Sequence, residues 1–231
     1  MDFKFVLNEI CAVLETYRGR DKILRTLCYS LKLVGGLTGN ELLGDKLIYI
    51  SKHLSDTRAT LRLLDDIPML KFSLDYGLGK KEDSKFLSYV GVLCNLIDHI
   101  YYPIEKIAWL AEHKLITKVN SSKWDTACTI CWLLSIYLSL FRSLRHLCHL
   151  EKHLAELESK NNSIEDIKEF KRKEIYEFIT ITRLFLDLIH ATSSFPRGRL
   201  FPFELTTWQV GLIGSTSSIL GLYQIFTKRH M

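Results

Sequence analysis

Apolar residues recur along most of this chain at intervals of three and four, which is the spacing of an amphipathic helix. The chain has only four prolines, and few stretches alternate between apolar and polar residues as strands do. The pattern therefore predicts an all-α fold. We expect helices over the following ranges: Phe3–Thr16, Asp21–Val34, Asn40–Ile67, Ser84–Ala111, Thr126–Glu158, Ile164–Ala191 and Leu205–Phe226.

Turn-forming residues mark the boundaries of the early helices. We expect Tyr17–Lys22 to form a charged turn, in which Gly19 caps the preceding helix and Asp21 caps the next one. Gly35 and Gly36 are expected to end the second helix, and Pro68 to break or kink the third.

The last helix is the clearest membrane candidate. Leu205–Phe226 contains no charged residue, and it is long enough to cross a hydrocarbon core of about 30 Å. Small residues recur in it at intervals of four, which favours close packing of helices in a membrane. We expect a self-association face made of these residues: Gly211, Gly214, Ser215, Ser218 and Gly221. A buried C-terminal helix of a soluble bundle is the alternative interpretation.

A second uncharged run, Thr126–Phe141, lies between Asp125 and Arg142 and is short for a span. It could cross a thin bilayer, lie re-entrant or pack inside a bundle. The predicted fold class is thus a helical membrane protein with amphipathic N-terminal helices and one or two transmembrane helices. We expect residues 1–123 to be cytosolic or interfacial. Residues 124–231 would form the membrane region, with spans at 126–141 and 205–226 joined by a charged helical loop.

A long amphipathic stripe occupies the third predicted helix. Two arginines lie beside it, where their stems could run along apolar surface and leave the charges among lipid headgroups. Packing of the stripe against the two preceding helices is the alternative. The candidate membrane-insertion face consists of Leu43, Leu47, Ile50, Leu54, Arg58, Leu61, Arg62 and Leu64.

Composition fits a mostly water-facing chain with few membrane helices. The net charge is +5 and is spread over both halves, so no basic arm points to nucleic acid. The six cysteines lie at apolar positions without the spacing of a disulfide framework, and we expect free thiols.

The sequence offers little chemistry. Cys128 and Cys131 with His146 and His149 resemble a set of zinc ligands. However, the segment between Cys131 and His146 is nearly all apolar, and the two histidines are closer in sequence than in usual zinc sites. The segment Gly39–Lys46 departs from a phosphate-binding loop, because Asp45 displaces the lysine and no strand precedes it. We expect a protein that is not an enzyme and that holds no metal or cofactor.

Several segments, in this order, resemble the peroxisomal membrane elongation protein family (the eleventh peroxin), and its gamma-type branch in particular. The resemblance runs nearly end to end. The segments are Tyr17–Lys22, Leu33–Gly36, Arg58–Asp66, Tyr76–Gly79, Asp98–Glu105 with Trp109, Phe195–Gly198 and Trp208–Gln224.

The resemblance implies a multi-pass peroxisomal membrane protein with both termini in the cytosol. Its members elongate and constrict the membrane before division, and they form homo-oligomers and hetero-oligomers with related members. They associate with tail-anchored fission adaptors, which recruit a dynamin-like GTPase. The family's membrane-remodelling helix matches Leu43–Leu64, and Arg58 and Arg62 match its basic positions. Asp65 and Asp66 depart from the more basic pattern of many members, which implies an auxiliary or regulatory role.

Two other function classes stay open on the sequence. A non-selective solute pore would need a polar, water-facing stripe on its spans, for which Thr207, Ser218 and Gln224 are the candidates. A soluble helical interaction module would bury both uncharged runs in its own core.

Overall fold

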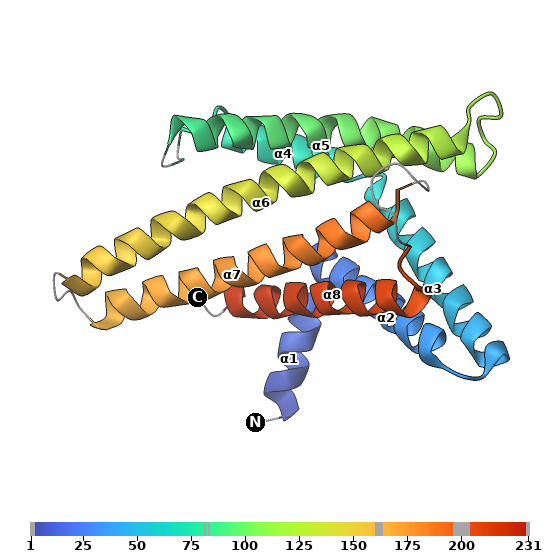
Figure 1. The fold of residues 1–231 in the computed structure, drawn as a ribbon, viewed down its shortest axis with the longest axis horizontal. Coiled ribbons are helices and arrows are strands. Elements are labelled where there is room, and N and C mark those ends of the chain that lie inside the picture. Colours follow the sequence, from blue (N-terminus) through green and yellow to red (C-terminus); the bar gives the residue numbers. More distant parts are fainter. Residues whose placement is uncertain (1–2, 81, 83, 160–163, 196–203, 230–231) are drawn as a thin grey trace. The chain divides into compact units, whose positions relative to one another are not determined.

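A computed structural model describes residues 3–80, 82, 84–159, 164–195 and 204–229. Within these residues the fold is all-α, as the sequence predicts, and it contains no strand (Figure 1). Of the segment Phe195–Gly198, which carries part of the resemblance, only Phe195 lies within the described residues. The helices are α1 (Phe3–Leu14), α2 (Tyr17–Leu37), α3 (Glu41–Arg62), α4 (Asp66–Tyr76), α5 (Lys85–Glu112), α6 (Ser121–Ser159), α7 (Ile164–Ser193) and α8 (Thr207–Arg229).

The predicted turn at Tyr17–Lys22 is wrong, because this segment forms the first turns of α2. Thr16 caps the helix: its Oγ1 accepts a hydrogen bond from the backbone N–H of Gly19 at 3.1 Å. Gly19 is needed here for space, since a Cβ would overlap the backbone oxygen of Val13. From the sequence alone, a glycine needed for close packing cannot be distinguished from a glycine that forms a turn.

The third predicted helix is also divided differently. α3 ends at Arg62 and α4 begins at Asp66, so the break precedes Pro68. Pro68 lies in the first turn of α4, where a backbone N–H has no partner within the helix and its absence costs nothing. The charged pair Asp65–Asp66 therefore marks a helix start.

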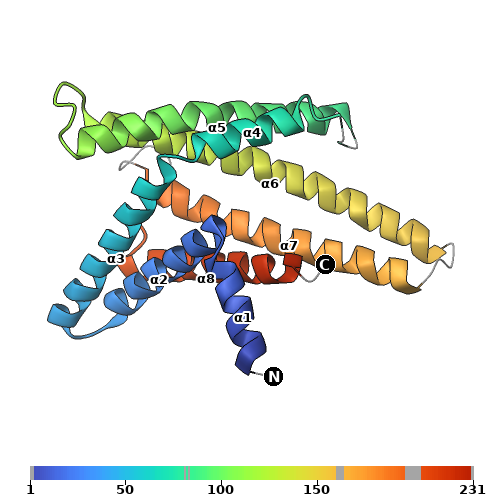
Figure 2. The same ribbon diagram turned by 180° about the vertical axis from the view of Figure 1, so that it is seen from behind.

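The chain divides into two compact units, and the first contains α1, α2, α8 and α3 up to Ala59. Its main contact is between α2 and α8, which lie side by side in both views (Figures 1 and 2). They run antiparallel, because Trp208 at the start of α8 lies against Gly36 near the end of α2.

The second unit, residues 60–202, contains α4 to α7. α5 packs against α6, and α7 packs against the other side of α6. Ring contacts fix both pairings: Phe86 meets Phe141 at 5.7 Å between centroids, and Trp132 meets His190 at 5.6 Å. α5 is continuous through Pro103. These units describe packing only, so the membrane boundary predicted near residue 124 stays a prediction.

Few apolar side chains are buried in this fold. Those in the described residues are Val13, Cys28, Leu87, Val90, Cys94, Ala108, Ile136, Leu150 and Ala191. Large apolar side chains are exposed on every helix, whereas Ser217, Ser218 and Gln224 of α8 are buried. A water-soluble bundle buries its apolar faces instead. The distribution agrees with a chain whose helices have apolar surroundings.

Close packing of α2 and α8 leads to a first prediction. A Cβ at Gly211 would overlap the backbone of Leu33, so Gly211→Ala must push the two helices apart. We expect it to lower the free energy of unfolding in detergent by about 1–3 kcal/mol. Gly39→Ala is the control, since nothing lies within 4 Å of a Cβ there, and it should change stability by about 0.5 kcal/mol at most. Equal losses in the two variants would contradict the close contact.

Candidate membrane-active surfaces

The predicted insertion face lies along one edge of α3. Leu43, Ile50 and Leu61 are exposed, and so is Leu64, which follows the helix. The remaining two, Leu47 and Leu54, are half-buried. The stripe therefore has an outward edge, and its other edge is turned toward the protein.

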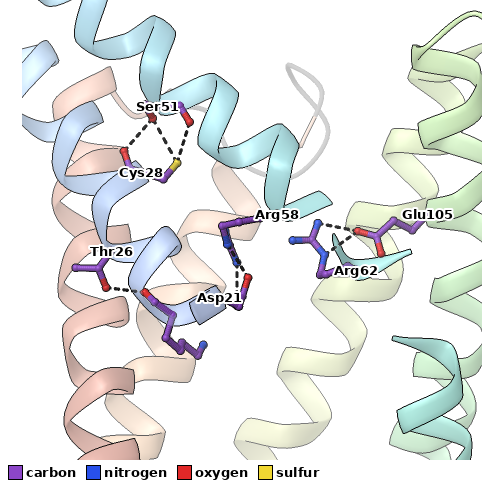
Figure 3. A network of polar contacts seen from close by, with 8 residues as sticks. Asp21, Thr26, Cys28, Ser51, Arg58, Arg62 and Glu105 are labelled. Atoms are coloured by element: carbon purple, nitrogen blue, oxygen red, sulfur yellow. Dashed lines mark hydrogen bonds and ion pairs between the residues drawn. The ribbon is translucent and has the colours of Figure 1, made fainter. Parts of the chain in front are cut away.

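α2 and α3 are joined by a buried polar contact (Figure 3). The Oγ of Ser51 donates to the backbone oxygen of Cys28 at 2.8 Å, and the Cys28 thiol donates to the backbone oxygen of Ser51 at 3.2 Å. Gly35 and Gly44 allow the backbones to approach, since a Cβ at Gly44 would lie 2.9 Å from the Gly35 oxygen. This contact fixes which side of α3 faces α2.

Arg58 does not extend outward along the stripe, because it pairs with Asp21 of α2. Its Nε donates to Asp21 Oδ1 at 2.8 Å, and its Nη2 to Oδ2 at 3.4 Å (Figure 3). The side chains are only 12% and 20% exposed, so this is a largely buried ion pair. It belongs to the first unit.

Arg62, one turn further along α3, pairs with Glu105 of α5 in the second unit. Its Nε and Nη2 donate to Glu105 Oε1 at 3.0 and 2.7 Å (Figure 3). The hydroxyl of Tyr101 donates to the same oxygen at 2.8 Å. Nearby, Lys106 donates to Asp66 at 2.6 Å, and this hydrogen bond lowers the pKa of the Asp66 carboxyl.

The two acidic partners were not identified from the sequence. Asp21 was expected to cap a helix, and Glu105 had no expected role. A glutamate four residues after Tyr101 in an apolar segment is a weak signal of a buried acceptor. The arginine partners lie 37 and 43 residues away in sequence, and no local pattern indicates such pairs.

The five residues of the predicted self-association face are all buried, and the main neighbour of α8 is α2 of the same chain. Gly214 lies under the ring of Tyr29, and Gly211 lies against Leu33. Ser218 Oγ donates to the Gly214 oxygen within α8 at 2.6 Å. The small residues thus permit close helix packing, and in this chain the neighbouring helix is α2.

Catalytic or metal-binding chemistry gains no support from the described residues. No group of three or more His, Cys, Asp or Glu side chains among them lies close enough to hold a metal ion. Cys128, Cys131, His146 and His149 are all within the part of the chain that is described.

Two helices, α6 and α8, are long and apolar enough to cross a membrane. Only 6% of the most apolar window of α6 is buried, against 39% for α8, which is covered by α2. These helices and the exposed apolar faces define the class: an all-α protein with candidate membrane spans. Within that class, the chain belongs to the family of peroxisomal biogenesis factor 11 (PEX11), whose model matches residues 7–226.

Two curated relatives agree with this assignment. The chain is 37% identical over 228 residues to human "Peroxisomal membrane protein 11C", covering 94% of this chain and 93% of the relative. It is 34% identical over 229 residues to the mouse protein of the same name, covering 95% and 94%. No solved structure matches the chain. The resemblance stated from the sequence is confirmed, including its gamma-type branch.

The buried carboxylate of Glu105 leads to a second prediction. Arg62→Met leaves that charge without its cation, and we expect a loss of about 2 kcal/mol or more in the free energy of unfolding. The double variant Arg62→Met/Glu105→Gln also removes the charge, so its loss should be smaller by about 1 kcal/mol. Unfolding in detergent, followed by circular dichroism, measures both.

An exposed ion pair provides the control for this comparison. Lys173 and Glu169 lie one turn apart on α7 and are both well exposed. Lys173→Met should change stability by about 0.5 kcal/mol or less. A double variant at Arg62 and Glu105 that is less stable than Arg62→Met would contradict the proposed cost of the unpaired carboxylate.

Proposed function

We propose that this protein resides in the peroxisomal membrane and promotes the remodelling, elongation and division of peroxisomes. Its family and the names of its relatives support the location and the general role. The structural observation that carries the mechanism is the outward apolar edge of α3, formed by Leu43, Ile50 and Leu61.

The exposed side of α3 has the composition of a helix that lies at a membrane surface. Besides the apolar edge it exposes Lys46 and Asp56, so it suits a boundary between acyl chains and water. Insertion of the apolar edge into the cytosolic leaflet would widen that leaflet relative to the other. Such an area difference bends a bilayer.

The two arginines of the predicted face are held in ion pairs within the protein instead of reaching lipid headgroups. Arg58 is held by Asp21 and Arg62 by Glu105, so their charges are satisfied within the protein. The Arg58 pair, together with the contact between Ser51 and Cys28, fixes which side of α3 faces α2, while Leu43 and Ile50 stay exposed. The leucines and isoleucine then contact lipid, and Lys46 remains available for headgroups.

Copies of the chain would gather through α8, as homo-oligomers or with related family members. We propose that Gly211, Gly214, Ser215, Ser218 and Gly221 supply the close helix contact. Since α2 covers these residues within one chain, a second copy reaches them when α2 is exchanged or displaced. Tail-anchored fission adaptors, and through them a dynamin-like GTPase, are the proposed partners. The proposed topology is multi-pass with both termini in the cytosol.

Two alternatives have less support. A non-selective pore needs polar side chains facing outward from α8, but Ser218 and Gln224 are buried and Thr207 is the exposed candidate of the three. Conductance across planar bilayers would favour this class. A soluble interaction module needs both apolar runs in its core, whereas only 6% of the most apolar window of α6 is buried.

The insertion mechanism predicts that charges on the outward edge of α3 abolish remodelling. We expect full-length protein carrying Leu43→Glu and Leu61→Glu to tubulate vesicles with anionic lipids at least about tenfold less than the unmodified chain. Each carboxylate opposes entry into the acyl region by about 1.4 kcal/mol or more, which is a factor of ten in partition. Electron microscopy of reconstituted vesicles measures the tubules.

A matched variant separates the position of the charge from the charge itself. Lys52→Ala with Ser55→Glu changes the net charge by the same amount on exposed positions away from the edge. It should tubulate vesicles like the unmodified chain. If both double variants lose activity equally, or neither does, the apolar edge of α3 is not the inserting surface.

The membrane location predicts resistance to alkaline extraction. We expect the chain to stay in the pellet when peroxisomal membranes are washed with sodium carbonate, because integral helices keep their lipid contacts at high pH. A peripheral matrix protein serves as the control for release. Recovery of the chain in the supernatant would favour the soluble interaction module.

A further inference from the structure

Where α5 lies beside the uncharged run of α6 (Thr126–Phe141), its apolar side chains are exposed and its polar side chains are less exposed. From residue 86 to 100, the exposed residues are all apolar or aromatic: Phe86, Tyr89, Leu93, Leu96 and Ile100. They recur at intervals of three and four, so they form one face. The polar residues of the same stretch, among them Asn95, Asp98 and His99, are less exposed than this face.

Contacts on the other two sides of α5 show which face is free. Toward α6, Asp98 accepts a hydrogen bond from Ser135 Oγ at 2.9 Å, and Phe86 meets Phe141. Toward α4, His99 Nε2 lies 2.9 Å from Ser73 Oγ. Apart from Phe86, whose ring borders α6, the apolar face turns away from both neighbours, and no described element of the second unit covers it.

The α6 run continues this surface. Between Asp125 and Arg145 its exposed residues are Ile130, Leu134, Tyr137 and Leu144, again at helical spacing and all apolar or aromatic. α5 and α6 run antiparallel, since Phe86 pairs with Phe141 and Asp98 with Ser135. Because α5 contacts α6 along this length, α5 should be in the membrane wherever α6 is.

Ion pairs bound the shared apolar surface at both ends. At one end, Arg142 donates to Glu82, just before α5 begins. At the other, Glu105 pairs with Arg62, and Lys106 with Asp66. The α5 segment between these ends, Phe86 to Ile104, is about 28 Å long, close to the thickness of a hydrocarbon core of about 30 Å.

We propose that α5 is embedded in the hydrocarbon layer beside α6, with Phe86, Tyr89, Leu93, Leu96 and Ile100 in contact with lipid acyl chains. This rests on the proposed membrane location. Asn95, Asp98 and His99 lower the mean hydropathy of α5, but Asp98 is turned toward α6 and His99 toward α4. The membrane region then begins near residue 86, and the hairpin of α5 and α6 adds one embedded helix to the two that composition identifies.

Spin labels on the full chain in vesicles test this proposal. Single cysteines are placed at Leu93 and Leu96 on α5 and at Leu134 on α6, with the other native cysteines replaced; the native exposed Cys148 is the aqueous reference. Labels at Leu93 and Leu96 should collide with a water-soluble nickel chelate at least about tenfold less than the label at Cys148. Their access to oxygen should match that at Leu134.

The outcomes separate this proposal from the proposed function. Nickel access at Leu93 and Leu96 like that at Cys148, with Leu134 shielded, would overturn the embedding of α5 alone. Nickel access at Leu134 as well would overturn the membrane location. Labels at Leu93 and Leu96 shielded from both oxygen and nickel would show a second copy or partner on this face, which also overturns contact with lipid.

A measurement on the unmodified chain covers the case in which the cysteine replacements disturb folding. Photoreactive groups on lipid acyl chains label residues that contact lipid, and trypsin releases α5 as one peptide between Lys85 and Lys106. We expect labelling of that peptide at least about tenfold above the peptide His146–Lys152, which carries polar exposed positions. Equal labelling of the two peptides would contradict the embedding.

Discussion

Close approach of helix backbones holds much of this structure together, because few apolar side chains are available inside it. Gly211 and Gly214 let α8 lie directly on α2, and Gly35 and Gly44 let α2 approach α3. In water, helices gain most of their packing energy from buried apolar area, but in lipid that gain is absent and backbone proximity replaces it. The same constraint accounts for the apolar side chains that remain on the outside of α5, α6 and α8.

Buried ion pairs also follow from the outward position of the apolar side chains. When apolar residues face outward, charged residues that are needed for insertion or topology must find partners inside or at the ends of the bundle. Asp21 with Arg58, and Glu105 with Arg62, meet this need on either side of one turn of α3. Such pairs contribute modestly to net stability but strongly oppose the loss of one partner. Within the first unit, the pair of Asp21 and Arg58 therefore helps to fix which side of α3 faces α2.

Local patterns in the sequence predicted most of the helices. The predictions failed where contacts between residues far apart in sequence decide the structure. Helical periodicity placed the helices, and the uncharged runs identified both candidate spans. The segment Tyr17–Lys22 was misread because Gly19 serves packing against α1, which no local pattern reveals. Likewise, Arg58 and Arg62 matched a basic interfacial position in sequence, but their partners lie 37 and 43 residues away. The outward position of Leu43, Ile50 and Leu61 depends only on the periodicity of their own helix, and their insertion into a membrane stays a prediction.

A polar residue lowers the mean hydropathy of a helix whether it faces the protein interior or the lipid. For this reason mean hydropathy alone does not identify α5 as a membrane helix. Asp98 faces Ser135, whereas Leu93 and Leu96 face outward, so the surface that α5 presents is far more apolar than its composition. α8 shows the same arrangement, with Ser217 and Gln224 inside and Leu212 and Ile219 outside. An average over all side chains describes a helix surrounded on every side by lipid. In a packed pair, the outward side chains of each helix determine its surroundings, and the inward side chains belong to the protein interior.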